Sequence, residues 1–277
     1  DKYQQRELLA AAGVPVPRYA LHPSDVDPET LSRAIAYPCV LKPLRLSASR
    51  GVIRADTPAG FVVAFRRLGA ILAQPDVAAC GEPARRLLVE QFIPGPEVAL
   101  EGLLIGGRLQ LLALFDKPDP LDGPFFEETI YVTPSRLPGA AQRAIAATAQ
   151  AAATALGLVE GPVHAELRHN DRGPWLIELA ARPIGGRCSG ALRFDVREKG
   201  SGKNVASLEE VIVRHALAMD LPAFRREDRA SGVMMVPVPG AGRLRDVRGV
   251  DDARAVPLVE AVVITAHRGQ RLVPLPE

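Results

Sequence analysis

Two glutamates stand in segments that alternate apolar and polar residues as β-strands do. Glu166 lies in the first segment, Glu178 lies in the second, and Asn170–Gly173 between them carries a turn signal. This pattern predicts a β-hairpin. If the strands pair symmetrically about Arg172, Glu166 lies directly opposite Glu178.

The same register assigns the neighbouring side chains to the two faces of the hairpin. His164 would lie opposite Ala180, on the face that carries the two glutamates. The other face would be apolar and would pack on the protein core. Its expected members are Val163, Ala165, Leu167, Trp175, Ile177 and Leu179.

Two opposed carboxylates destabilise a strand pair, because their Cβ atoms lie only roughly 4.5–5.5 Å apart. A divalent cation would remove the repulsion, and carboxylate oxygens are ligands that suit Mg²⁺ or Mn²⁺. The alternative is that Glu166 and Glu178 both face solvent on an exposed sheet face. The two residues alone leave both interpretations open.

The segment after the second glutamate favours a phosphate ligand. Arg182 follows Glu178 by four positions, and a guanidinium donates paired hydrogen bonds to phosphoryl oxygens. Gly185 and Gly186 allow backbone N–H groups to approach an anion closely. A simple turn would explain the glycines but not the arginine.

The composition excludes several classes of protein. The chain has 277 residues, 47% hydrophobic and 24% charged, which is typical of a globular protein with a sizeable core. A net charge of +2 with scattered lysines and arginines gives no argument for a nucleic-acid partner, and no apolar run is long enough to span a membrane. Three widely spaced cysteines indicate buried side chains in a reducing compartment, the cytoplasm.

Helical and strand patterns interleave along the chain, which indicates the α/β or the α+β class. The strongest helix signals are Thr57–Pro58 as a start and the Ser207–Glu210 capping box. We expect helices at residues 1–12, 58–72, 140–156 and 208–219, and strands at residues 37–43, 52–54, 87–93, 97–104, 108–115, 129–133, 232–238 and 259–265.

The order of these residues resembles the ATP-grasp superfamily of ligases. The spacing Glu178-x-x-x-Arg182-x-x-Gly185-Gly186 is similar to the family's metal and phosphate motif. The resemblance implies that Glu166 binds one metal ion, that Glu178 bridges two, and that Arg182 assists phosphoryl transfer. The family usually has an asparagine at the position of Ala180, so the number of metal ions stays open. The variant Glu-Leu-Ala-Ala-Arg resembles the branch that joins amino acids.

Two lysines and a loop resemble the family's phosphate-binding parts. Lys2 follows Asp1 as in the family's Asp-Lys start, and Lys42 matches a lysine on a strand of the lid. An exposed lysine at a strand end is the ordinary alternative for Lys42. The loop Ser47–Gly51 resembles the segment that closes over ATP, where Ser49 and Arg50 would contact the phosphates.

Residues 90–97 resemble the strand that grips the nucleoside. The resemblance implies that Glu90 and the backbone of Phe92 and Ile93 contact adenine, and that Glu97 contacts the ribose hydroxyls.

Substrate contacts are expected around the metal site. Glu128 lies in an acidic loop from which related ligases bind an amino group, although a solvated loop is an equal alternative. His164 would orient substrate or serve only a structural role. Gly185 and Gly186 would offer N–H groups to a carboxylate or an acyl phosphate.

The fold implied is an ATP-grasp fold, two α+β subdomains around the nucleotide, followed by a small α/β module. The family usually has a further domain before this region, and the chain begins at Asp1, so we expect it to be part of a longer protein. The expected parts are a linking helix and strand entry at 1–20, a lid subdomain at 21–92, a catalytic subdomain at 93–195 and a C-terminal ligase module at 196–277.

The activity implied is ATP- and Mg²⁺-dependent joining of a carboxylate and an amine through an acyl phosphate, with small molecules as partners and a homodimer left open. The alternatives are a carboxylase or purine-type ligase that uses bicarbonate or formate, and an ATP-binding module without catalysis. Gly200–Lys203 is not a phosphate-binding loop of the Gly-x-x-x-x-Gly-Lys type, because its spacing is wrong and no strand leads into it.

Overall fold

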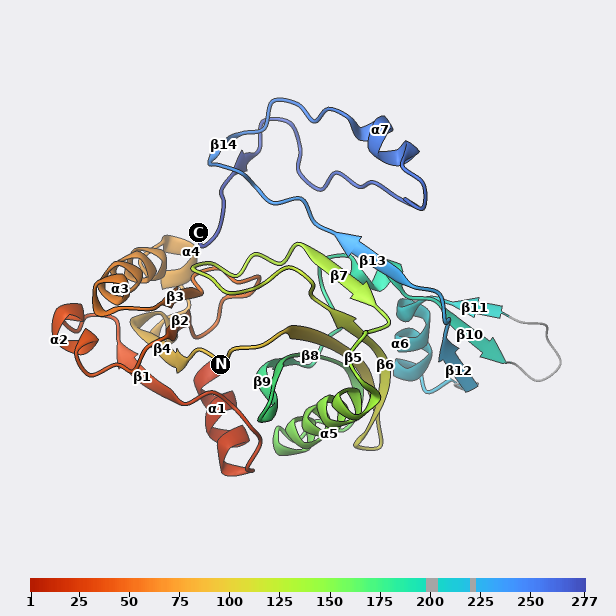
Figure 1. Ribbon diagram of the computed structural model, residues 1–277, viewed down its shortest axis with the longest axis horizontal. Helices are drawn as coiled ribbons and strands as arrows, with labels where there is room; N and C mark the ends of the chain where they lie inside the picture. Colours follow the sequence, from red (N-terminus) through yellow and green to blue (C-terminus); the bar gives the residue numbers. More distant parts are fainter. Residues whose placement is uncertain (198–203, 220–222) are drawn as a thin grey trace.

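Two antiparallel sheets, one of four strands and one of six, organise the protein (Figure 1). The computed structural model describes residues 1–197, 204–219 and 223–277. Gly200–Lys203, rejected above as a phosphate-binding loop, lies outside these ranges. The mixture of helices and strands confirms the α+β class.

The four-stranded sheet has the strand order β1-β4-β2-β3. Phe61, Phe65 and Leu68 project from one face of α3 onto it and form its apolar core with Leu41 and Leu87. Thr57 caps α3 by accepting a hydrogen bond from the Gly60 N–H at 3.1 Å. The elements are β1 (Tyr19–Pro23), α2 (Pro28–Ser32), β2 (Cys39–Pro43), β3 (Ile53–Ala55), α3 (Pro58–Leu72), α4 (Pro75–Ala78), η1 (Glu82–Arg85) and β4 (Arg86–Gln91).

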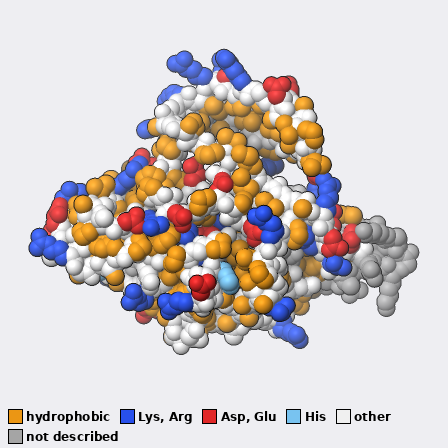
Figure 2. Space-filling view, viewed as in Figure 1, with side chains coloured by type: hydrophobic (Ala, Val, Ile, Leu, Met, Phe, Trp, Pro, Cys, Tyr) orange, Lys and Arg blue, Asp and Glu red, His pale blue; other side chains and the backbone are white. Residues whose placement is uncertain are grey.

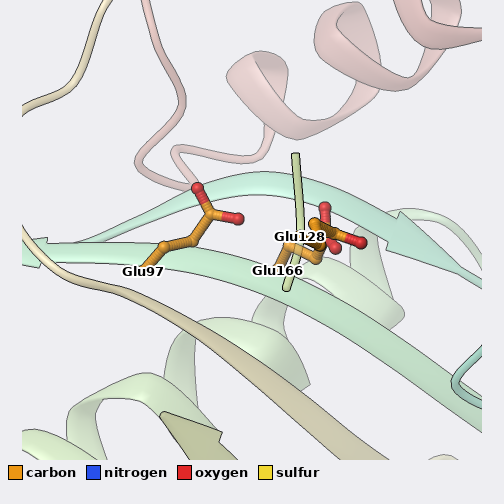
Figure 3. Close-up of side chains that lie close together, drawn as sticks. All are labelled: Glu97, Glu128 and Glu166. Atoms are coloured by element: carbon orange, nitrogen blue, oxygen red, sulfur yellow. The ribbon is translucent and has the colours of Figure 1, made fainter. Parts of the chain in front are cut away.

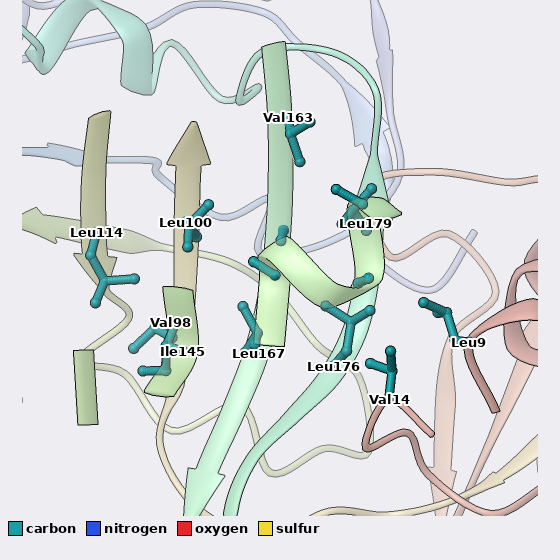
Figure 4. Close-up of a cluster of buried hydrophobic side chains, with 14 of the residues drawn as sticks. Leu9, Val14, Val98, Leu100, Leu114, Ile145, Val163, Leu167, Leu176 and Leu179 are labelled. Atoms are coloured by element: carbon teal, nitrogen blue, oxygen red, sulfur yellow. The ribbon is translucent and has the colours of Figure 1, made fainter. Parts of the chain in front are cut away.

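The six-stranded sheet has the order β13-β7-β6-β5-β8-β9. Its face toward α5 is apolar, and Leu9 of α1 and Ile145 of α5 close the core (Figure 4). Small alanines on α5 let the helix lie close to the strands. The elements are α1 (Lys2–Ala11), β5 (Glu97–Ile105), β6 (Arg108–Asp116), β7 (Ile130–Thr133), α5 (Gly139–Ala155), β8 (Gly161–Asn170), β9 (Gly173–Ala180) and β13 (Ser231–Met234).

A second apolar cluster covers the opposite face at one end of this sheet. Phe115 and Leu103 from the sheet meet Phe194, Leu208 and Ile184 there, and all of these side chains are buried. Ser207 caps α6 by accepting a hydrogen bond from the Glu210 N–H at 3.2 Å. The elements are η2 (Cys188–Ala191), β10 (Phe194–Arg197), β11 (Asn204–Ala206), α6 (Leu208–Ala216) and β12 (Ala223–Arg226).

The last residues form an arch that leaves β13 and returns to the four-stranded sheet (Figure 1). The Gly51 N–H donates to the Pro276 carbonyl at 2.6 Å, and Arg67 pairs with Glu277 at 2.9 Å. The end of the arch is therefore attached to the loop that precedes β3. Its elements are β14 (Gly242–Arg243), α7 (Val250–Ala255) and β15 (Arg271–Leu272).

Most of the expected elements are confirmed, and the exceptions lie mainly near the C-terminus. The strand expected at 259–265 is wrong, because Val259, Val263 and Ile264 are exposed and that segment pairs with no strand in the described chain. The helix that begins at Leu208 ends at Ala216 rather than at residue 219, and β13 is shorter than expected. The four expected parts of the chain stay predictions, and β13, expected in the C-terminal module, joins the six-stranded sheet.

The hairpin of β8 and β9 has the expected pairing only at one end. His164 lies opposite Ala180 and Glu166 opposite Glu178, but the register shifts after Glu166, so that Leu167 lies opposite Leu176. This bulge alters the predicted apolar face. Leu176 joins Val163, Ala165, Leu167 and Leu179 in the core, whereas Trp175 and Ile177 do not belong to that core cluster.

The two displaced side chains have other surroundings. Ile177 lines a cavity on the far side of the sheet. Trp175 is half-buried, donates to Asn170 at 3.3 Å and lies under the Arg172 guanidinium, 4.9 Å from the ring centre.

Two of the three cysteines are buried as expected, and Cys80 is only half-buried. Cys39 and Cys188 are buried and unpaired, and burial raises the pKa of each thiol to about 12. In the described part of the chain no helix is long and apolar enough to cross a bilayer.

The bulge makes a test of the register possible on two adjacent residues. We predict that Leu176→Ala lowers the free energy of unfolding by about 2–5 kcal/mol, the usual loss for a fully buried leucine. Trp175→Ala should cost less, because the indole is half-buried. Urea unfolding followed by circular dichroism measures both. Strict alternation predicts the reverse order, so a larger loss for Trp175→Ala would contradict the bulge.

Candidate active site

One cavity of about 530 Å³ lies between the two sheets. The four-stranded sheet contributes Lys42 and Glu90 to its lining, and the hairpin β8–β9 contributes Glu166 and Glu178. Figure 2 shows the hollow under the C-terminal arch, with acidic side chains inside it. Nearly every residue expected to act is in its lining: Lys2, Lys42, Ser49, Glu90, Phe92, Ile93, Glu97, Glu128, His164, Glu166, Glu178, Arg182, Gly185 and Gly186.

Arg50 is the exception, because it is absent from the cavity lining, and its expected contact with the phosphates stays a prediction. Its guanidinium pairs with Asp76 at 2.7 Å and also donates to Gln74, so it faces α4 rather than the cavity. Ser49 lines the cavity beside it. The turn explains the difference, because Ala48 and Ser49 have φ of 54° and 56° and direct the next side chain outward.

Glu166 and Glu178 meet different cations in the cavity. The Glu178 carboxylate lies 3.6 Å from the Lys2 Nζ, and the Glu178 side chain is 37% exposed. Glu166 accepts a hydrogen bond from the Lys117 Nζ at 2.9 Å and lies 3.7 Å from the His164 Nε2. The partly exposed Glu178 carboxylate, directly across from Glu166, is a hard oxygen donor of the kind that Mg²⁺ or Mn²⁺ binds. The residues therefore fit a divalent cation.

Three carboxylates surround Lys117, at the end of β6. Their oxygens lie within 4.8 Å of one another, and Figure 3 shows Glu128 and Glu166 together with Glu97 beside them. The Lys117 Nζ lies 2.8 Å from Glu97, 2.5 Å from Glu128 and 2.9 Å from Glu166. Burial alone would lower the pKa of Lys117, but the three carboxylates hold that pKa well above its usual value.

Within this cluster the pKa of Glu128 is raised and the pKa of Glu166 is lowered. Burial raises the pKa of Glu128 to about 7, and the charge of Glu166 adds to that shift. Burial also acts to raise the pKa of Glu166, but Lys117 outweighs it and lowers the pKa well below its usual value. Glu166 is thus held as a carboxylate.

A second buried group of ion pairs lies in the part of the cavity where the nucleotide is expected to bind. Glu90 is 2% exposed and pairs with Arg6 at 2.6 Å and with Lys42 at 2.7 Å. Burial would raise the pKa of Glu90, but the two cations lower it to about 2. Lys2 lies nearby, where burial lowers its pKa and its Nζ donates to the Leu46 carbonyl at 2.7 Å.

The strand end after Glu90 is held by several contacts. The Phe92 N–H donates to the Pro38 carbonyl at 3.1 Å, and the Ile93 carbonyl accepts from Arg168 at 3.1 Å. These two groups are engaged within the protein, and the expected contact of this backbone segment with adenine stays a prediction. The Phe92 ring lies between the guanidinium groups of Arg54 and Arg168, at 4.0 and 4.8 Å.

Arg168 also fixes Glu97, which was expected to contact the ribose. Its Nε donates to Glu97 at 3.0 Å, and Lys117 holds the other carboxylate oxygen. Glu97 is 9% exposed at the cavity wall. A ligand hydroxyl would therefore meet an oriented carboxylate.

The segment after β9 brings its arginine and glycines to the cavity. Arg182 and Gly185 line it, and the Ile184 N–H between them donates to Glu101 at 2.9 Å. Gly186 has φ of +61°, and a Cβ there would lie 2.9 Å from the Met235 sulfur. Only glycine fits that position without displacing Met235.

Sequence reasoning missed four charged residues of this site: Arg6, Glu101, Lys117 and Arg168. Lys117 could have been identified from the sequence, because Asp116-Lys117-Pro118 begins the acidic loop that contains Glu128. Alternation also places Arg168 on the same strand face as Glu166. Arg6 carried no such signal, because it is one polar residue in an ordinary helix.

The comparisons with known proteins agree with this geometry. Residues 35–191 match the ATP-grasp domain family. The chain is 32% identical to the dapdiamide A synthase of Enterobacter agglomerans over 249 residues, which are 87% of this chain and 56% of that protein. It is 28% identical to the D-alanine–D-alanine ligase of Aromatoleum aromaticum over 186 residues, 66% of this chain and 56% of that protein.

A solved structure gives the same result in three dimensions. The L-amino acid ligase from Bacillus licheniformis superposes with a TM-score of 0.80 at 27% identity, over 100% of this chain and 65% of that one. The chain spans about half the length of the curated relatives it matches. The family match covers more than half of the chain. The chain therefore belongs to the ATP-grasp family, beside the carboxylate–amine ligases.

Proposed function

We propose that the protein is an ATP- and Mg²⁺-dependent carboxylate–amine ligase that forms an amide or peptide bond between amino-acid substrates. The observation that carries the proposal is one cavity that combines Lys2, Lys42 and Arg182 with the opposed acids Glu166 and Glu178. Cations and metal-binding carboxylates around one cavity suit phosphoryl transfer, which depends on positioning and charge neutralisation.

The reaction has two steps. A carboxylate oxygen of the first substrate attacks the γ-phosphorus of ATP, and ADP leaves with the electrons of the broken P–O bond. The acyl phosphate then accepts an amine at its carbonyl carbon, phosphate leaves, and the nitrogen loses a proton. No protein nucleophile is needed, and holding the reactants together supplies much of the rate.

The cavity residues divide between these tasks in our proposal. Arg182 would stabilise the transferring phosphoryl group, and Glu166 and Glu178 would hold the divalent cation, which supplies neutralising charge to the phosphates. Gly185 and Gly186 would donate N–H groups to the acyl phosphate. The nucleotide would contact Lys2, Lys42, Ser49, Glu90, Phe92, Ile93 and Glu97.

An amino-acid amine is supported by the acids around Lys117. Glu97, Glu128 and Glu166 surround Lys117, and Glu97 also pairs with Arg168 at 3.0 Å, so three acids face two cations beside the proposed phosphate site. Glu128 lies at the cavity wall, where its carboxylate would attract a substrate ammonium group, and His164 would orient the substrate. The names of the amino-acid ligases among the relatives agree with this chemistry.

The proposed reaction predicts phosphate release that depends on amino acids. With ATP and Mg²⁺, at least one amino-acid pair should raise phosphate release about tenfold or more above ATP alone, and mass spectrometry should find the joined product. Stimulation by bicarbonate but by no amino acid would favour a carboxylase instead. ATP binding without stimulated turnover by any substrate would favour a binding module.

The metal site predicts the behaviour of Glu178→Gln. We expect turnover to fall by about a hundredfold or more, since an amide is a weaker ligand for a divalent cation, with the circular dichroism spectrum unchanged. Glu82→Gln is the control, because Glu82 is exposed and, among the residues that the structure describes, forms its ion pair with Arg86 on the surface. Turnover near that of the unmodified protein would remove Glu178 from the metal site.

The amine site predicts a selective effect of Glu128→Gln. The KM for the amine substrate should rise about tenfold or more, because a neutral amide attracts an ammonium group weakly, whereas the KM for ATP should change less than about threefold. Glu127→Gln, at the adjacent position, serves as the matched control. Equal effects on both substrates would place Glu128 elsewhere in the mechanism.

A further inference from the structure

Glu101 is a buried charged residue behind the cavity wall. It lies on β5, is 0% exposed and is absent from the cavity lining. None of the roles proposed above uses it. A carboxylate withdrawn from water is costly to the fold, so its contacts indicate what it does.

One carboxylate oxygen of Glu101 holds the loop that carries the phosphate-binding groups. Its Oε2 accepts the Ile184 N–H at 2.9 Å. Ile184 lies two residues after Arg182 and directly before Gly185, and all three line the cavity. The hydrogen bond therefore fixes the middle of the loop from the side that faces away from the cavity.

The same side chain faces His164 on the neighbouring strand. The two residues are directly paired between β5 and β8, and the Glu101 Oε2 lies 3.8 Å from the His164 Nδ1. On its other side, the His164 Nε2 lies 3.7 Å from Glu166 in the cavity. His164 thus lies between the buried carboxylate and the proposed metal site.

Two buried atoms of this pair lack partners. Among the described residues, neither the Glu101 Oε1 nor the His164 Nδ1 has a hydrogen bond. Buried polar atoms are nearly always hydrogen-bonded, and a buried polar atom without a partner calls for an explanation, such as a functional role. A shift of roughly 1 Å would bring the two groups within hydrogen-bond distance, given the usual N···O range.

We propose that Glu101 is a positioning residue that holds His164 and the loop Arg182–Gly186 in fixed relation to each other. The inference rests on the proposed function and deepens it, since the loop and His164 flank the place where phosphoryl transfer would occur. With its two oxygens, the Glu101 carboxyl group can accept from the Ile184 N–H and also bond the His164 Nδ1, as acceptor when ionised and as donor when protonated, whereas an amide has a single acceptor oxygen. Small displacements of catalytic groups lower reaction rates strongly. A buried residue that fixes their positions therefore affects catalysis without contacting the substrate.

A purely structural role is the competing explanation. On that account Glu101 only satisfies the Ile184 N–H and contributes to stability. Burial raises the pKa of Glu101 to about 8, against the opposing effects of the Ile184 N–H and Arg182, so a carboxyl group is an unfavourable choice for that task alone. A glutamine would satisfy the same N–H at lower cost.

The test uses Glu101→Ala and the nearly isosteric Glu101→Gln, with Thr133→Val as the control. Thr133 is also fully buried in the six-stranded sheet and donates to the Leu114 carbonyl, away from the loop. Amide hydrogen exchange of residues 182–188 measures how firmly the loop is held, and this measurement does not require catalytic activity. Exchange should accelerate about tenfold or more in Glu101→Ala and stay near that of the unmodified protein in Glu101→Gln.

Kinetics report the coupling to His164. In Glu101→Ala we expect kcat to fall about a hundredfold with the KM for ATP changed less than about threefold. Glu101→Gln should recover part of kcat, because the amide oxygen still accepts the Ile184 N–H. In a His164→Ala background the Glu101→Gln substitution should have no further effect, since the partner through which it acts is gone.

The outcomes separate this proposal from the proposed function. Unchanged exchange at residues 182–188 in Glu101→Ala overturns it, and so does a kcat loss no larger than that of Thr133→Val at matched stability. If the unmodified chain joins no substrates, the proposed function fails, but the exchange measurement still decides whether Glu101 holds the loop. If Glu101→Ala does not fold, additivity of Glu101→Gln and His164→Ala in the kinetics overturns the proposal.

Discussion

A carboxylate buried between two sheets needs a cation beside it, and this requirement shapes the cavity at two places. Glu90 lies between Arg6 and Lys42, and Glu97, Glu128 and Glu166 surround Lys117. Removing one partner from such a group leaves a charge without compensation, which is far more costly than losing the pair together. The two groups join helix α1, both sheets and the loop before β7.

The sequence predicts the part of the site that depends on local pattern. Alternation in β8 and β9 placed Glu166 opposite Glu178, because a strand pair has a fixed period of two residues. The order of the motifs identified the family, and the cavity gathers residues separated by more than a hundred positions. The strand pairing and the order of the motifs follow from short stretches of chain and can be read from the sequence alone.

The rest depended on interactions that no local pattern encodes. The bulge after Glu166 places Leu176 in the core in place of Trp175 and Ile177, and there Leu176 belongs to the same cluster as Ile145 of α5. The position of Arg50 outside the cavity lining goes with a left-handed turn at Ala48 and Ser49 and with its ion pair to Asp76. Arg6 reaches Glu90 only because α1 crosses the gap between the sheets.

The position of β13 has a consequence for how the protein is made. This strand pairs with β7, and Met235 directly after it rests against Gly186, yet both are synthesised long after the rest of the sheet. Until they leave the ribosome, β7 presents an open edge, which in partly folded chains invites pairing with other molecules. The cavity also needs Lys2 and Arg6 from the first helix. A nascent or truncated chain therefore holds an incomplete cavity, and the wall against Gly186 closes only when translation has passed Met235.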